Sequence, residues 1–225
     1  MNLGFQQKER QTLDLLQSEL DGFRKSGRRV FATSSFQSQS VPLLHMLGNH
    51  FPEVGILFLD TRFLFPETYA FKETLAQRFH LNVITLQSTS SLEQQRETKS
   101  GLFQYALNPD RCCFINKVQP LDNFLKSGDV WISGVRRDQT SVRKMMNTLE
   151  ENDKGILKFH PMLEWTNKDI HYYIQHYGLP QHPLEKEGYV SIGCIPCTYK
   201  WMGDEQRGGR WVGSKKTECG LHTGK

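Results

Sequence analysis

Short runs of apolar residues, separated by segments with helical periodicity, constrain the fold of this chain more than any other feature. The apolar runs occupy residues 30–33, 54–59, 82–86 and 129–133, with a fifth, weaker run at 156–159. The helical patterns occupy residues 4–26, 41–50, 66–79 and 167–177. This alternation predicts an α/β fold: a mainly parallel twisted sheet with helices on both faces. Such sheets bind ligands beyond the carboxyl ends of their strands, so we expect the functional residues there.

Composition points to a soluble domain with an appendage. The chain has 225 residues, of which 37% are hydrophobic. No run approaches the roughly 20 apolar residues of a membrane span, so we expect no membrane association. The net charge of +4 is too mild to predict a nucleic-acid partner. Residues 203–225 are rich in glycine and charged side chains, and we expect a flexible C-terminal tail there, after a folded domain over residues 1–202.

The cysteines divide into two pairs and one single residue. The pairs are Cys112-Cys113 and Cys194-Ile-Pro-Cys197, whereas Cys219 stands in the string Glu-Cys-Gly-Leu-His. Adjacent cysteines cannot form a disulfide with each other without strain, and the first residues lack a signal-peptide pattern. We therefore expect a reducing, cytoplasmic location and thiols used for ligation or catalysis. From the spacing alone, the two pairs suit a zinc ion and an iron–sulfur cluster about equally.

Cys219 is the candidate for chemistry, because the two pairs leave it without a partner. Lys215, Lys216 and His222 are close to it in sequence and would stabilise a reactive thiolate. The alternative is an inert thiol on an exposed tail.

Polar turns follow the predicted strands, where an anionic ligand would bind. Residues 33–40 read Thr-Ser-Ser-Phe-Gln-Ser-Gln-Ser, which can offer hydroxyls, backbone N–H groups and a helix N-terminus to phosphate or sulfate. Plain helix capping by serine is the alternative. Asp60 and Thr61 end the second strand, where they either face a ligand or cap a helix. Arg136 and Arg137 follow the fourth strand and could clamp an anion, unless one of them pairs with Asp138.

Together these segments resemble the assimilatory adenylyl-sulfate reductases, which are relatives of the phosphoadenylyl-sulfate reductases. The resemblance covers nearly the whole chain from about Val30. It rests on the serine-rich turn, Leu-Asp-Thr…Phe-Pro-Glu-Thr-Tyr at 59–69, Gly-Val-Arg-Arg-Asp-Gln at 134–139, the two cysteine pairs and the terminal Glu-Cys-Gly-Leu-His. It implies an adenine-nucleotide α-hydrolase-like sheet, with residues 1–202 as the nucleotide-binding reductase domain and 203–225 as a catalytic tail. It also implies a 4Fe–4S cluster, held by Cys112, Cys113, Cys194 and Cys197.

The activity implied by the resemblance is the reduction of adenosine 5′-phosphosulfate (APS) to sulfite and AMP. Cys219 would be the nucleophile and carry a cysteine S-sulfonate, which a dithiol of the thioredoxin type would then reduce. The phosphosulfate would be bound by Lys117, Arg207, Arg210 and His222. The rest of the substrate would be bound by Ser34, Ser35, Phe36, Gln37, Asp60, Thr61, Arg62, Arg136 and Arg137. We also expect a homo-oligomer.

Two departures from the family pattern bear on the substrate. Arg62 stands where the family commonly has glycine, so the backbone of that turn is expected to differ. The turn at 35–40 lacks the Gly-Ala-Glu-Asp of many cluster-bearing members and is closer to the phosphoadenylyl relatives. The cysteines thus favour APS, while the turn leaves the 3′-phosphorylated substrate (PAPS) open. A zinc-stapled nucleotide-binding module and an ATP user of the sulfate adenylyltransferase type are the alternative functions.

Overall fold

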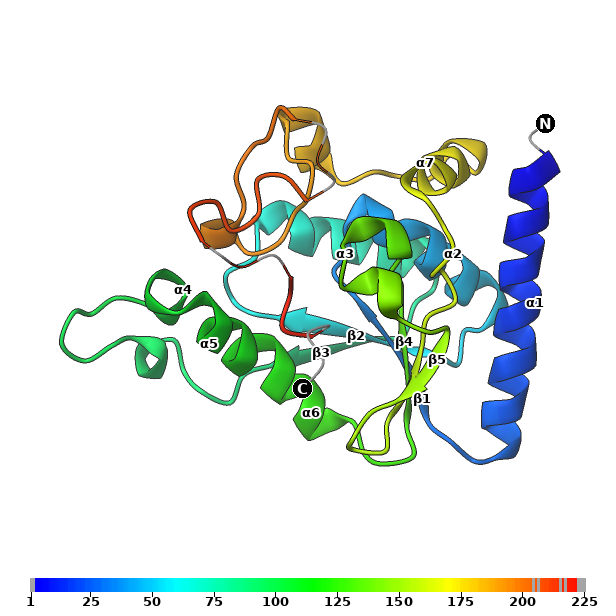
Figure 1. The fold of residues 1–225 in the computed structure, drawn as a ribbon, viewed down its shortest axis with the longest axis horizontal. Helices are drawn as coiled ribbons and strands as arrows, with labels where there is room; N and C mark the ends of the chain where they lie inside the picture. The colour runs from blue at the N-terminus through cyan, green and yellow to red at the C-terminus, as the bar shows by residue number, and fades with distance from the viewer. Residues whose placement is uncertain (1–2, 204, 206, 215, 217, 222–225) are drawn as a thin grey trace.

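The centre of the fold is a twisted sheet (Figure 1). The structure is a computed structural model that describes residues 3–203, 205, 207–214, 216 and 218–221. Within these residues the sheet has six strands in the order β3-β2-β1-β4-β6-β5. The strands are β1 (Val30–Ser34), β2 (Gly55–Asp60), β3 (Val83–Gln87), β4 (Val130–Ser133), β5 (Leu149–Glu151) and β6 (Leu157–Phe159). All neighbours pair in parallel except β5, which runs antiparallel to β6. The predicted fold class is confirmed.

One face of the sheet is covered by the longer helices. These are α1 (Leu3–Lys25), α2 (Val41–His50), α3 (Pro66–Arg78) and α7 (Asn167–His176), and each lies within about two residues of its predicted range. Successive strand residues point to opposite faces, so Ile56 and Phe58 join the hydrophobic cluster under these helices. Leu57, between them, joins a separate cluster with Leu121 and Trp131 on the other face.

The second face is covered by a run of short helices that the sequence did not predict. The run comprises α4 (Gln104–Leu107), α5 (Pro109–Cys113), the π-helical turn η3 (Phe114–Val118) and α6 (Gln119–Phe124). Helices this short show too few repeats for a visible apolar period. Local start signals were nevertheless present: Pro109 begins α5, and the Asn108 side chain accepts a 3.0 Å hydrogen bond from the Arg111 amide.

Single 3-10 turns connect these elements. They are η1 (Ser38–Ser40), η2 (Glu93–Gln95), η4 (Arg137–Gln139), η5 (Arg143–Met145), η6 (Pro183–Glu187) and η7 (Ile195–Cys197). In the described part of the chain, no helix has both the length and the apolar character needed to cross a bilayer.

The described residues of the 203–221 segment lie against the domain. A bridge pairs Arg210 with Thr198, and Trp211 is buried. In Figure 1 this segment, coloured orange to red, passes from the η7 region over the carboxyl ends of the strands toward α5 and α6. The division at residue 203 stays a prediction.

Candidate active site

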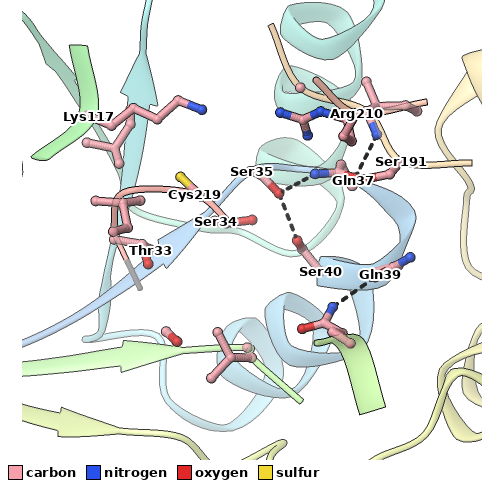
Figure 2. A pocket seen from close by; sticks show the side chains of 18 of the residues that line it. Thr33, Ser34, Ser35, Gln37, Gln39, Ser40, Lys117, Ser191, Arg210 and Cys219 are labelled. Atoms are coloured by element: carbon pink, nitrogen blue, oxygen red, sulfur yellow. Dashed lines mark hydrogen bonds between the residues drawn. The ribbon is translucent and has the colours of Figure 1, made fainter. Parts of the chain in front are cut away.

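A cavity of about 190 Å³ lies at the carboxyl ends of β1, β2 and β4. This is the edge of the sheet where the fold class predicts ligand binding. Its wall combines the 33–40 turn, the loop after β4, the segment before Cys194 and the C-terminal segment. In Figure 2, Lys117 and Cys219 lie on one side of the view, with Gln39 and Ser40 on the other.

The 33–40 turn presents polar side chains to this cavity. Ser34, Ser35 and Gln37 line it, as do Gln39 and Ser40 of the same turn. The Gln37 side chain holds the turn: its Nε2 donates to Ser35 Oγ at 3.1 Å within the turn, and its Oε1 accepts from the Ile192 N–H at 2.9 Å, in the segment before Cys194. Phe36 and Ser38 do not line the cavity: Ser38 is buried, and the positive φ of Phe36, 51°, turns its ring into the core, edge-on against Phe58. The structure therefore does not bring Phe36 to the cavity.

Asp60 and Arg62 stabilise their own turn instead of facing the cavity. Asp60 accepts hydrogen bonds from the Arg62 amide at 2.8 Å, from Tyr69 Oη at 2.5 Å and from Gln87 at 2.7 Å. Arg62 adopts φ 62°, a left-handed conformation that glycine tolerates best, so this turn keeps a backbone suited to glycine although arginine stands there. Its guanidinium donates to the Ser88 and Ser90 carbonyls, which hold the loop after β3.

The two arginines after β4 also lie outside the cavity wall. Arg136 is fully buried and bonds Asp138 at 3.1 Å and Gln39 at 3.4 Å. Arg137 bonds Glu164 and the Lys144 carbonyl, both at 2.7 Å. Arg143, from the same basic stretch, lines the cavity instead, although its sequence position gave no sign of that.

The Cys219 thiol shares the cavity wall with Lys117, Arg207 and Arg210. Burial alone would raise the pKa of Cys219, but the charge of Lys117, the Leu221 amide and the two arginines outweigh burial and lower it. The thiolate is the form that acts as a nucleophile, and a lowered pKa increases its share. The predicted partner His222 and Lys215 lie outside the described residues.

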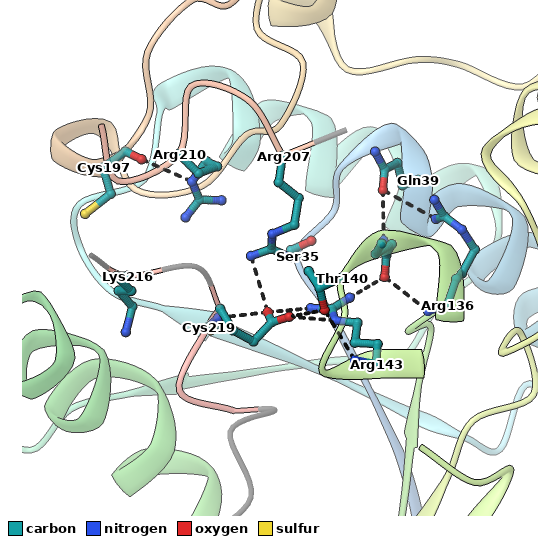
Figure 3. A network of polar contacts seen from close by, with 12 residues as sticks. Ser35, Gln39, Arg136, Thr140, Arg143, Cys197, Arg207, Arg210, Lys216 and Cys219 are labelled. Carbon is teal, nitrogen blue, oxygen red and sulfur yellow. Dashed lines mark hydrogen bonds and ion pairs between the residues drawn. The ribbon is translucent and has the colours of Figure 1, made fainter. Parts of the chain in front are cut away.

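Glu218 is a site residue that the sequence-based reasoning did not select, although it precedes Cys219. Its carboxylate is buried and accepts from Arg143 Nε at 3.0 Å, Arg143 Nη2 at 2.8 Å and Thr140 Oγ1 at 3.0 Å. Arg207 Nη2 lies 3.3 Å away, and the Cys219 amide donates at 2.8 Å (Figure 3). Burial opposes ionisation of Glu218, yet Arg143 and Arg207 lower its pKa to about 2. The side chain is therefore ionised at neutral pH.

The four paired cysteines line a second, smaller cavity. Cys112 and Cys113 come from α5, Cys194 immediately precedes η7, and Cys197 is the last residue of η7. Thr61 also lines this cavity, with its hydroxyl 3.2 Å from Cys194 Sγ. Lys117 and Arg210 line both cavities, so the cysteine site and the Cys219 site share a wall.

The groups around this second cavity fit a thiolate-bound cofactor. Burial and the neighbouring cysteines raise the pKa of Cys112 to about 12 and that of Cys197 to about 11, so these thiolates need a positively charged partner to form. Trp211 Nε1 is buried and finds no hydrogen-bond partner among the described residues. Among the described residues, no group of three or more histidine, cysteine, aspartate or glutamate side chains is arranged to hold a single metal ion.

The sequence of the chain is similar to named reductases over most of its length. An adenosine 5′-phosphosulfate reductase of Salinibacter ruber is 39% identical over 193 residues, which cover 84% of this chain and 76% of the relative. A phosphoadenosine 5′-phosphosulfate reductase of Gloeobacter violaceus is also 39% identical, over 207 residues covering 90% of this chain and 86% of the relative.

Solved structures share the fold. The phosphoadenylyl-sulfate reductase of Candida auris, in its phosphate complex, superposes with a TM-score of 0.62 at 22% identity, covering 81% of this chain and 94% of that one. The NH3-dependent NAD synthetase of Campylobacter jejuni reaches a TM-score of 0.57 at 13% identity, over 82% of this chain and 78% of that one. The phosphoadenosine phosphosulfate reductase domain matches residues 29–200. The family that the motifs indicated is thus confirmed, and the chain belongs to the phosphoadenosine phosphosulfate reductase family.

Proposed function

We propose that this protein reduces APS to sulfite and AMP, with Cys219 as the nucleophile. The observation that carries the proposal is the Cys219 thiol on the wall of a cavity with Lys117, Arg207 and Arg210. This arrangement combines an activated sulfur nucleophile with cations suited to an anionic substrate. The names of the curated relatives support the same reaction.

The first step is attack of the Cys219 thiolate on the sulfuryl sulfur of APS. A sulfur–sulfur bond forms, and the bond from that sulfur to the phosphate oxygen of AMP breaks. The electron pair of that bond leaves with AMP, and negative charge grows on its phosphate. Lys117, Arg207 and Arg210 are placed to stabilise this charge, and the lowered pKa of Cys219 increases the fraction of thiolate available for the attack.

The second step is reduction of the Cys219 S-sulfonate by an external dithiol of the thioredoxin type. One thiolate of the donor attacks the Cys219 sulfur and displaces sulfite, and the second donor thiolate then releases Cys219. The donor ends as a disulfide, and two electrons have passed to the sulfuryl group. We also propose that residues 203–225 close over the bound substrate. We expect the protein to act in the cytoplasm and as a homo-oligomer.

APS is favoured over PAPS as the substrate. The support for APS is the set of four paired cysteines that lines the second cavity, which the family resemblance associates with APS, whereas the hydroxyls and amides of the 33–40 turn leave PAPS open. Arg136, which would be a candidate for a second phosphate, is buried against Asp138. The Gloeobacter violaceus relative, named for PAPS, leaves the same chemistry on PAPS as the second candidate.

A 4Fe–4S cluster is the cofactor we propose for the second cavity. Cys112, Cys113, Cys194 and Cys197 would hold it, since such clusters are bound by four cysteine thiolates. When bound, the cluster would supply structural cross-linking and an electrostatic field next to the substrate. The Thr61 hydroxyl is placed to donate to Cys194 Sγ and orient that ligand.

The test is a single turnover without any thiol donor. APS added to the cluster-loaded protein should release about one AMP per chain and leave a peptide containing Cys219 heavier by roughly 80 Da, the mass of SO3. Reduced thioredoxin should then release sulfite and remove the added mass. AMP release with the label on another residue would contradict the role of Cys219. A higher specificity constant for PAPS under the same conditions would move the substrate assignment to PAPS.

A further inference from the structure

We infer that Glu218 is a positioning residue for this reaction: its carboxylate docks the C-terminal segment on the loop after β4 and so holds the Cys219 thiol at the cavity. The role in turnover rests on the proposed function, whereas the docking itself rests on the contacts of the described residues.

The carboxylate is bound from several parts of the chain. Both oxygens accept from the Arg143 guanidinium, at 3.0 and 2.8 Å, and Thr140 Oγ1 donates at 3.0 Å. Arg207, which lies earlier in the same C-terminal segment, adds a contact at 3.3 Å. Glu218 is only 4% exposed and Arg143 only 5%. A two-pronged, buried guanidinium–carboxylate pair fixes orientation as well as distance, and breaking it leaves an uncompensated charge.

The thiol is one peptide away from this anchor. The Cys219 amide donates to Glu218 Oε1 at 2.8 Å, so the carboxylate holds the peptide that carries the thiol. On the other side of Cys219, Leu221 packs against the hydrophobic cluster formed by Leu57, Leu121 and Trp131. Cys219 is thus held on one side by the ion pairs of Glu218 and on the other by the apolar contacts of Leu221. Figure 3 shows the polar network that includes Arg143, Arg207 and Cys219.

Docking by Glu218 makes a prediction opposite to that of a substrate-binding role. Arg143 and Arg207 also line the cavity, and the Glu218 carboxylate offsets part of their charge. Neutralising Glu218 therefore makes the cavity more positive, which favours an anionic nucleotide. The same change releases the thiol. Nucleotide affinity should hold or rise while the covalent step slows.

The experiment uses the cluster-loaded full chain and the isosteric variant Glu218→Gln. Breaking a buried ion pair predicts roughly a 100-fold slower release of AMP from APS in the absence of thiol. The dissociation constant for AMP should stay within about 3-fold of the wild type or fall below that range, because the cavity keeps its cations. Amide hydrogen exchange in the peptide that contains Cys219 should speed up, which reports undocking without any turnover.

Glu164→Gln is the matched control, since it breaks the exposed pair with Arg137 that lies outside the cavity wall. Exposed pairs contribute little, so its AMP release and its exchange should stay within about 2-fold of the wild type. Arg143→Gln should accelerate exchange as Glu218→Gln does, and the double variant should add nothing further, because the two side chains act as one pair.

Unchanged exchange in Glu218→Gln overturns the inference, as does a loss of AMP affinity that matches the loss of rate. If the wild type releases no AMP from APS, the proposed function fails, and exchange of the Cys219 peptide still decides whether Glu218 docks the tail. If Glu218→Gln misfolds, Glu218→Asp replaces it. This variant keeps the charge but has a side chain shorter by one methylene. Amide exchange of the Cys219 peptide equal to that of the wild type, together with a full loss of the rate of AMP release, would contradict docking.

Discussion

Asn116→Leu offers a test of how the cysteine-bearing helices are fastened to the domain. Asn116 is 1% exposed, and its Nδ2 donates to Gln95 Oε1 at 2.6 Å and to the Cys112 carbonyl at 3.1 Å. Gln95 is itself buried and donates to the Ser90 carbonyl at 3.3 Å, so the contact joins the π-helical turn to the loop after β3.

The expected loss of unfolding free energy follows from these hydrogen bonds. Two hydrogen bonds at about 1 kcal/mol each disappear, and Gln95 Oε1 loses its donor inside the protein at a cost of about 1 kcal/mol or more. Asn116 Oδ1 is buried and has no hydrogen-bond partner among the described residues, so its removal offsets about 1 kcal/mol of this loss. The net effect is about 2 kcal/mol of unfolding free energy. For a chain of this size each kcal/mol shifts the melting temperature by roughly 2–4 °C, which predicts a fall of about 4–8 °C.

The measurement is a thermal melt by circular dichroism, with iron per chain determined on the same samples. Asn49→Leu is the control, because Asn49 bonds His45 on an exposed helix surface, and it should melt within about 2 °C of the wild type. A melting temperature of Asn116→Leu that is equally close to the wild type would refute the reasoning. So would a double variant with Gln95→Leu whose loss equals the sum of the two single losses, since paired residues should not add.

Three further predictions concern chemistry, cofactor and pH. Cys219→Ser should bind nucleotide and keep its iron yet lose sulfite production almost entirely, as a coupled sulfite assay would show, because a hydroxyl is a far poorer nucleophile than a thiolate. Cys194→Ser should lower iron content and melting temperature together, since binding energy at such a site is folding energy; full iron with a normal melt would remove Cys194 from the ligand set. Burial lowers the pKa of His182 from 6.5 to about 4, so the unfolded chain takes up its proton first and stability falls as pH drops through that window. Relative to His182→Asn, the wild type should lose about 3 kcal/mol between about pH 7 and pH 4, and urea titrations that show a constant difference would contradict this.

The parallel strands were predictable because they appear as continuous apolar runs, which in β2 and β4 are buried on both faces. Strand β5 was missed for the opposite reason: it reads Leu-Glu-Glu at the sheet edge and has no apolar pattern of its own. The strand order was also out of reach, since the register of distant segments depends on packing that no local window contains.

The site residues, like the strands, were predictable where local sequence places them and not where tertiary contacts decide. Ser34, Ser35 and Gln37 were expected at the ligand and do line the cavity, because a polar turn after a buried strand must face the open edge of the sheet. Phe36 lies between them and points the other way, since one positive φ redirects the side chain. Arg136 and Arg137 were expected at the ligand because of their charge and position. Arg136 pairs instead with Asp138, the local alternative visible in the sequence, whereas Arg137 pairs with Glu164, which only the fold brings near.

The π-helical turn at 114–118 carries a consequence for how this chain tolerates changes in length. It holds one residue more per hydrogen-bonded ring than an α-helix, and it separates the cysteines of α5 from α6, which packs under the sheet through Leu121. Removing one residue there would let a continuous α-helix form and rotate α5 about the helix axis by about 100°. Cys112 and Cys113 would then leave the side of the helix that faces Cys194, although every side chain of the site would still be present. The number of residues in this turn thus sets the direction in which Cys112 and Cys113 point. A deletion in the turn should therefore be more damaging than most substitutions within it.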